Sequence, residues 1–193
     1  GLKRVWASLW NFRAYEEREY FQIPHQKAGM AVLVSDAFPN ELANGVAFTG
    51  NPALRGDRRF LVNAQFEDNE VVFTDPGVVA EKDVLEMADG NVAGIIRVRA
   101  SSLVPPGSFV LSDDNLRELG AVMALVESKY PIDLGSHQAD EVLLDFELKL
   151  DRETGHIRLK QVRPFLIAAR GGDPPAQLQL KVPAGLTLAR AAE

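Results

Sequence analysis

Two stretches of the chain repeat apolar side chains at the spacing of an α-helix. The first, Leu2–Ile23, carries a stripe of large apolar and aromatic residues with glutamates on the other side, and it ends before Pro24. Its Arg13 and Arg18 are expected to be solvated. The second, Ser112–Pro131, opens with a serine and two aspartates, which favour a helix start. The pattern predicts one helix at the beginning of the chain and another in its second half.

Short runs of β-branched and apolar residues lie between these two helices. Glycine, proline or polar residues bound each run, which is typical of strands joined by turns. The runs that we predict to be strands are Met30–Val34, Gly45–Thr49, Arg58–Gln65, Asn69–Asp75 and Val92–Ala100.

The last ordered unit predicted by the pattern is a β-hairpin. Its strands are Asp140–Leu150 and His156–Phe165, with DRETG as the turn. Strands with a few helices, in no strict alternation, indicate an α+β fold with a mostly antiparallel sheet and packed helices. Beyond Phe165 the sequence RGGDPP is typical of a linker. We therefore predict a domain at residues 1–165 and a linker or tail toward a following domain at 166–193.

Four polar residues recur two positions apart in this hairpin: Asp145 and Glu147 before the turn, Gln161 and Arg163 after it. Residues two apart share one face of a strand. If Glu147 lies opposite Gln161 and Asp145 opposite Arg163, all four share a face. Mg²⁺ prefers oxygen ligands such as those of Glu147 and Gln161, and the guanidinium of Arg163 suits a phosphate. This arrangement predicts a magnesium–nucleotide phosphate site.

A purely structural alternative stays open at this point. Asp145 could pair with Arg163, and Glu147 with Lys160 or Lys149, in surface ion pairs worth about 0–1 kcal/mol each. In a regular strand, Ile157 and Leu159 also fall on the same side as Gln161. Both faces of the hairpin would then be partly apolar. On the hairpin alone, ion pairs are the commoner explanation.

Composition narrows the possible classes of function. The chain has 193 residues and a formal net charge of −6, which disfavours a general nucleic-acid or acidic-membrane surface. The absence of cysteine excludes disulfides, thiolate metal sites and cysteine nucleophiles. There is neither an apolar run of about 18 residues nor a signal-peptide pattern, so we expect a cytoplasmic protein. A helix that begins at once, without an initiator methionine, leads us to expect a segment of a longer chain.

Four motifs, taken in their order along the chain, resemble a known family. They are VWASLWNFRAYEERE, ANGVAFTGNP, DFELKLDRETG and LKQVRPF. Together they resemble the second half of the ATP-binding domain of the phosphoenolpyruvate synthase and pyruvate phosphate dikinase family. The resemblance covers roughly Val5–Phe165. It implies the carboxy-terminal half of an ATP-grasp nucleotide-binding domain.

The resemblance also implies roles for individual residues. Glu147 looks like the family's metal-binding acid, Gln161 like its second metal or phosphate contact, and Arg163 like its catalytic, phosphate-contacting arginine. The run MAVLV resembles the strand that borders the adenine, so the backbone at Val32 and Val34 is expected to contact ATP. Relatives commonly carry a glutamine in that strand, which this chain lacks.

The function implied by the resemblance is that of a phosphotransferase part that holds Mg–ATP for phosphoryl transfer to a histidine carrier. The family's amino-terminal half of the nucleotide domain and its phosphohistidine domain do not occur in these residues. Both are expected partners, and this chain alone is not expected to be active. The alternative is a non-catalytic nucleotide-sensing or assembly module with the same fold.

Overall fold

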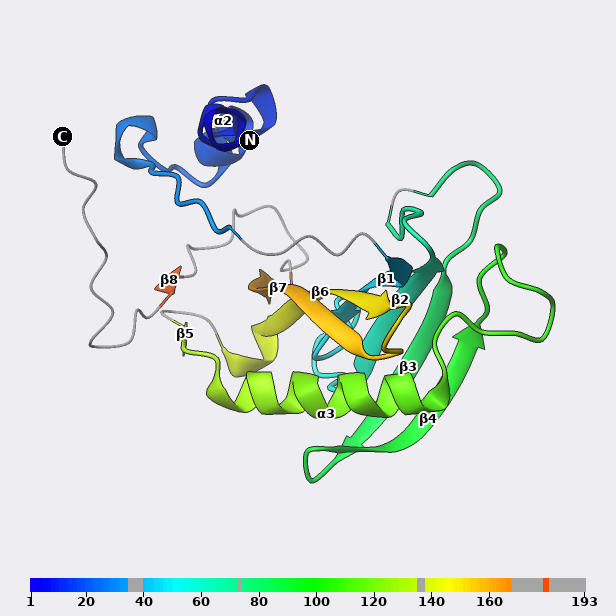
Figure 1. The fold of residues 1–193 in the computed structure, drawn as a ribbon. Helices are drawn as coiled ribbons and strands as arrows, with labels where there is room; N and C mark the ends of the chain where they lie inside the picture. The colour runs from blue at the N-terminus through cyan, green and yellow to red at the C-terminus, as the bar shows by residue number, and fades with distance from the viewer. Residues whose placement is uncertain (35–39, 73, 135–137, 168–178, 181–193) are drawn as a thin grey trace. The chain divides into compact units, whose positions relative to one another are not determined.

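A computed structural model of the chain describes residues 1–34, 40–72, 74–134, 138–167 and 179–180 (Figure 1). The chain divides into two compact units, residues 1–37 with 168–177 and residues 38–167 with 178–193. Most of the predicted tail, namely 168–178 and 181–193, lies outside the described residues. None of the helices in the described ranges is long and apolar enough to cross a membrane.

The smaller unit contains two short helices where the pattern predicted one. They are α1 (Leu2–Ser8) and α2 (Phe12–Tyr20), followed by the 3-10 helix η1 (His25–Lys27). The break falls at Asn11, whose backbone is extended and which precedes α2 as its N-cap. Asparagine favours such a cap over the helix interior, because its side chain competes for backbone hydrogen bonds.

Two further expectations for this unit are wrong. Arg18 is buried, not solvated, because its Nε donates to Nδ1 of His25 at 2.9 Å and its guanidinium lies 5.4 Å from the centre of the Trp10 ring. Residues Met30–Val34 form no strand. No described strand pairs with this run, so its apolar side chains do not enter a sheet, and that of Val34 is 80% exposed.

The larger unit is built on a six-stranded sheet in which every neighbouring pair is antiparallel. The order is β4-β3-β2-β1-β6-β7. Together with the helices, this sheet confirms the α+β class. The strands of this sheet are β1 (Glu41–Phe48), β2 (Phe60–Phe66), β3 (Glu81–Ala88), β4 (Asn91–Arg99), β6 (Val142–Asp151) and β7 (Ile157–Leu166). The short strand β5 (Ile132–Asp133) pairs with β8 (Gln179–Leu180), and the 3-10 helix η2 (Ala139–Glu141) precedes β6.

The strands differ from the prediction in two places. Strand β3 escaped prediction because its sequence EKDVLEMA is half charged and lacks an apolar run. The predicted strand Asn69–Asp75 is wrong, since its described residues form bends and loop. Here Glu67 has a positive φ of 56°, and Nδ2 of Asn44 donates to the carbonyl oxygens of Glu67 and Asn69 at 2.7 and 2.9 Å. These bonds hold the chain in a turn and direct it away from the sheet.

The predicted helix α3 (Asp113–Lys129) is confirmed and packs on one face of the sheet (Figure 1). Oγ of Ser112 caps it by accepting the N–H of Asn115 at 3.1 Å. Gly120 permits the close approach, because a Cβ there would lie 2.3 Å from Cγ2 of Val92. The core between helix and sheet includes Ala43, Ala47, Val62, Ala64, Leu85, Leu116, Leu119, Met123, Leu144, Phe146, Leu148 and Leu150. We call this side the α3 face and the opposite side the outer face.

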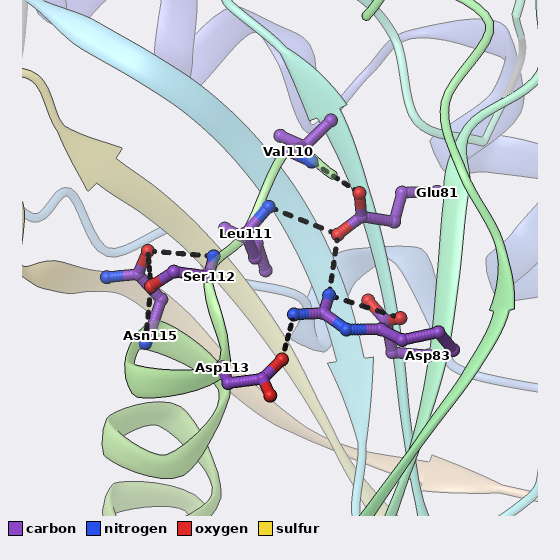
Figure 2. A network of polar contacts seen from close by, with 8 residues as sticks. Glu81, Asp83, Val110, Leu111, Ser112, Asp113 and Asn115 are labelled. Atoms are coloured by element: carbon purple, nitrogen blue, oxygen red, sulfur yellow. Dashed lines mark hydrogen bonds and ion pairs between the residues drawn. The ribbon is translucent and has the colours of Figure 1, made fainter. Parts of the chain in front are cut away.

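A buried polar network holds the start of α3 against β3 and β4 (Figure 2). The carboxylate of Glu81, which is fully buried, accepts the backbone N–H groups of Val110 and Leu111, the residues that lead into the helix. The guanidinium of Arg97 lies 3.5 Å from Glu81 and 2.5 Å from Asp113 in the first turn of α3. Strand β3 therefore binds the helix start through hydrogen bonds to backbone donors that would otherwise lack partners.

Asp83 is the least satisfied member of this network. It is fully buried, and within the described residues neither carboxylate oxygen accepts a hydrogen bond. The nearest cation is Nη1 of Arg97 at 3.4 Å. Burial raises the pKa of Asp83 from 3.8 to about 7, and the neighbouring negative charge of Glu81 adds to the shift.

This raised pKa makes the stability of the fold depend on pH. Between about pH 4 and pH 7 the folded chain holds a proton on Asp83 that the unfolded chain has lost, so the free energy of unfolding falls as pH rises through this window. In the wild type, this fall in the free energy of unfolding should be on the order of 2 to 4 kcal/mol, and we expect Asp83→Asn to remove it. Urea unfolding of both proteins at several pH values measures it. Parallel pH curves for the two proteins would contradict the assignment.

Candidate functional site

The hairpin of β6 and β7 has the register that the sequence predicted. Glu147 lies opposite Gln161, and Asp145 lies opposite Arg163. Directly opposed residues of an antiparallel pair share a face. All four side chains therefore belong to the outer face, since the neighbours of Glu147 along the strand, Phe146 and Leu148, are in the core under α3.

A β-bulge explains the apolar residues that the sequence analysis could not place. After the pair Glu147–Gln161, the register shifts so that Leu148 lies opposite Leu159, which leaves Lys160 as the extra residue. The shift moves Leu159 and Ile157 to the α3 face, where both pack against the core. The outer face is consequently free of them, and the two-sided apolar pattern disappears.

The turn fixes this register from its other end. Oδ1 of Asp151 accepts the backbone N–H groups of Glu153 and Thr154 at 2.9 and 3.0 Å, and Gly155 has the positive φ of 69° that the tight turn requires. The hydrogen bond from Thr154 and then that from Glu153 lower the pKa of Asp151. The turn and the bulge together set which side chains of β7 reach the outer face.

Asp145 and Arg163 form one ion pair on the outer face, with Nε of Arg163 at 2.8 Å from Oδ2 of Asp145. Asp145 is 5% exposed, and its Oδ1 is buried without a hydrogen bond in the described part of the chain. The side chain of Arg163 is 60% exposed. Because the aspartate engages Nε, the two terminal nitrogens of the guanidinium remain available for a bidentate anion contact.

The structural alternative is met in one of its two parts: Asp145 pairs with Arg163, but within the described residues Glu147 forms no ion pair with Lys160 or Lys149. In the described part of the chain, neither Glu147 nor Gln161 has a hydrogen-bond or ion-pair partner for its side chain. Lys149, one of the cations considered for Glu147, pairs instead with Glu41 on β1. A carboxylate and a carboxamide thus lie opposite each other on the outer face, without protein partners.

A hollow of about 520 Å³ adjoins Glu147. Strands β1, β6 and β7 form its base, and residues 68–72 form its rim. Lys149 and Lys160 line it together with Glu147. Asn44 lines it as well, and the hydrogen bonds of Asn44 to the 67–69 turn hold the rim in place. The volume lies within the range of small-molecule sites.

The protein side chains at this site could supply only some of the ligands that a hard cation needs. Within the described ranges, no group of three or more histidine or acidic side chains could hold a metal ion. Mg²⁺ ordinarily takes one or two protein ligands and completes its octahedron with water and phosphate oxygens. The side-chain oxygens of Glu147 and Gln161, which have no protein partner among the described residues, meet that requirement.

The motif residues that follow β1 have structural tasks. Oγ1 of Thr49, which is fully buried, accepts the N–H of Leu144 at 3.0 Å and so extends the β1–β6 pairing. Oδ1 of Asn51 accepts the N–H of Ala53 at 3.0 Å in the following loop. Val32 and Val34, the expected adenine contacts, belong to the smaller unit, so their assignment stays a prediction.

Two features of the site were absent from the sequence analysis. Lys160 was considered only as a surface partner for Glu147, because a bulge leaves no mark in an alternating pattern apart from Ile157 and Leu159 falling on the wrong face. Most of the rim, residues 69–72, was predicted as the start of a strand. The asparagine and acidic residues there, in the sequence EDNE, were the signal for a turn.

Comparison with known proteins places the chain in a family. Residues 1–179 match the family model described as "Pyruvate phosphate dikinase, AMP/ATP-binding domain". A phosphoenolpyruvate synthase of Pyrococcus furiosus is 26% identical over 185 residues, which covers 85% of this chain and 21% of that protein. A probable phosphoenolpyruvate synthase of Pyrococcus abyssi is 26% identical over 184 residues, with 84% and 21% covered.

A third relative, a probable phosphoenolpyruvate synthase of Pyrococcus horikoshii, is 25% identical over 185 residues. The chain spans about a fifth of the length of each of these curated relatives, which is 21% in every case. The family match extends over nearly all of the sequence, from the first helix past the hairpin. The chain therefore belongs to the pyruvate phosphate dikinase AMP/ATP-binding domain family.

Proposed function

We propose that this chain is the ATP-binding part of a phosphotransferase similar to phosphoenolpyruvate synthase. In this proposal Glu147 and Gln161 hold Mg²⁺, and Arg163 contacts a phosphate of ATP. The observation that carries it is the pairing of an unpartnered carboxylate with an unpartnered carboxamide on the outer face, beside a hollow of about 520 Å³. Membership of the AMP/ATP-binding domain family supports the choice of ligand.

Each residue has a separate task in this proposal. The carboxylate of Glu147 and the amide oxygen of Gln161 would be the hard ligands that hold the cation beside the hollow. Asp145 fixes the guanidinium of Arg163 through Nε, so that the terminal nitrogens face outward at low entropic cost. Magnesium would supply neutralisation of phosphate charge, and phosphoryl transfer depends mainly on such positioning and charge stabilisation.

The domain assignment belongs to the same proposal. Residues 1–165 would form the carboxy-terminal half of an ATP-grasp nucleotide-binding domain, and residues 166–193 would connect it to a following domain. The acceptor of the phosphoryl group would be a histidine on a carrier domain of the parent protein. The length of the curated relatives, of which this chain spans 21%, leaves room for such domains. The backbone at Val32 and Val34 would contact the adenine.

Replacing Glu147 tests the metal ligand. In the complete protein, we expect Glu147→Gln to abolish the magnesium-dependent part of ATP binding, because the amide keeps the shape but lacks the negative charge. Calorimetric titration with ATP, in excess Mg²⁺ and in EDTA, measures the difference. Lys129→Gln, at the exposed end of α3, is the matched control and should behave as wild type. Unchanged magnesium dependence in Glu147→Gln would remove the central ligand from the proposal.

Deleting Lys160 tests whether the bulge organises the site. Without the extra residue, β7 must present either Ile157 and Leu159 or Gln161 and Arg163 to the wrong face. We expect a loss of about 2 kcal/mol in the free energy of unfolding, or loss of magnesium-dependent ATP binding, or both. Urea unfolding and the same titrations measure these effects. Lys160→Ala, which keeps the residue count, is the control for the stability measurement. A deletion variant with wild-type stability and metal dependence would show that the bulge is dispensable.

A further inference from the structure

Lys160 occupies an unusual position in the hollow beside Glu147. Both side chains line the same space and carry opposite charges. Nevertheless, within the described residues neither has an ion-pair or hydrogen-bond partner. Oppositely charged neighbours on a surface ordinarily gain little by pairing, so their separation costs little and leaves both groups available to a ligand.

The β-bulge determines where Lys160 lies. The residue has no opposite partner in the register, because Gln161 pairs with Glu147 and Leu159 pairs with Leu148. A regular strand would alternate Lys160 to the α3 face, away from Glu147 and Gln161. The bulge instead places Lys160 on the outer face, where it lines the hollow together with Glu147. The bulge that moves Ile157 and Leu159 to the α3 face thus also adds the Lys160 cation to the outer face.

Charge balance in the hollow indicates what this cation could bind. Four carboxylates and two ammonium groups line the hollow, which leaves a formal charge of −2 that one divalent cation balances. Lys149 is already paired with Glu41. A polyphosphate on the metal would add negative charge that needs a further cation. Lys160 is the lysine of the lining that has no carboxylate partner among the described residues.

We propose that Lys160 donates to a phosphate oxygen of a metal-bound polyphosphate in this hollow. The inference rests on the proposed function and adds to it a second phosphate-contacting cation beside Arg163. The ligand chemistry is that of a polyphosphate chelated to a divalent cation, either on a nucleotide or as inorganic polyphosphate.

The test compares wild type with Lys160→Met in the complete protein. Methionine keeps the length and the apolar stem of lysine and retains the residue count of the bulge. Calorimetric titrations use Mg–ATP, Mg–tripolyphosphate and adenosine. We expect Lys160→Met to weaken Mg–ATP binding about tenfold, because one charge-assisted hydrogen bond is lost. Adenosine binding should remain unchanged. Lys129→Met removes the same charge outside the hollow and should change each affinity less than twofold.

The three ligands separate the possible outcomes. A tenfold loss for Mg–tripolyphosphate as well supports a contact to any metal-bound polyphosphate, whereas a loss for Mg–ATP alone supports a contact that needs the nucleotide. Equal Mg–ATP affinity in wild type and Lys160→Met, with Glu147→Gln impaired, would overturn the role of Lys160 and leave the proposed function intact. Equal losses for ATP and adenosine would overturn it too, because the lysine would then act on the nucleoside. A wild-type protein that binds no Mg–ATP would remove both proposals.

Discussion

The arrangement of this molecule depends on one irregular backbone pairing, the β-bulge at Lys160. Every side chain of β7 between the bulge and the turn changes face because of that extra residue. The apolar residues Ile157 and Leu159 enter the core, while Gln161 remains opposite Glu147 on the outer face. A single strand can therefore contribute both to a hydrophobic core and to a polar site, with no residue exposed on the wrong side.

The rest of the larger unit supports that pairing. β6 lies between β1 and β7, and the close pairing of β1 with β2 requires Gly45, where a Cβ would lie 2.8 Å from the backbone oxygen of Asn63. On the α3 face, the buried carboxylate of Glu81 binds backbone donors at the start of the helix. A strand that is paired on both sides, as β6 is, positions Glu147 more accurately than a loop would. The asparagine-held rim at residues 68–72 then encloses the space beside them.

Sequence reasoning succeeded where a pattern was long and local. The hairpin register followed from the two-residue spacing of Asp145, Glu147, Gln161 and Arg163, and α3 followed from its cap and its apolar stripe. It failed where tertiary contacts decide the structure. Strand β3 conceals its pattern because Glu81 and Asp83 are buried acids, which sequence rules assign to the surface. The run Met30–Val34 has strong strand propensity but lacks a described strand beside it, and propensity alone does not make a sheet. The bulge was visible only as the unexplained placement of Ile157 and Leu159.

We propose that the side chains of Glu147 and Gln161 together bind one divalent cation. A crystal structure of the complete protein with Mn²⁺ and a non-hydrolysable ATP analogue tests it most directly, because the anomalous signal locates the metal independently of the nucleotide. We expect the metal about 2.1 Å from a carboxylate oxygen of Glu147 and from the amide oxygen of Gln161. A metal bound elsewhere with the nucleotide, with Glu147 and Gln161 making no bond to it, would show that these two residues are not its ligands.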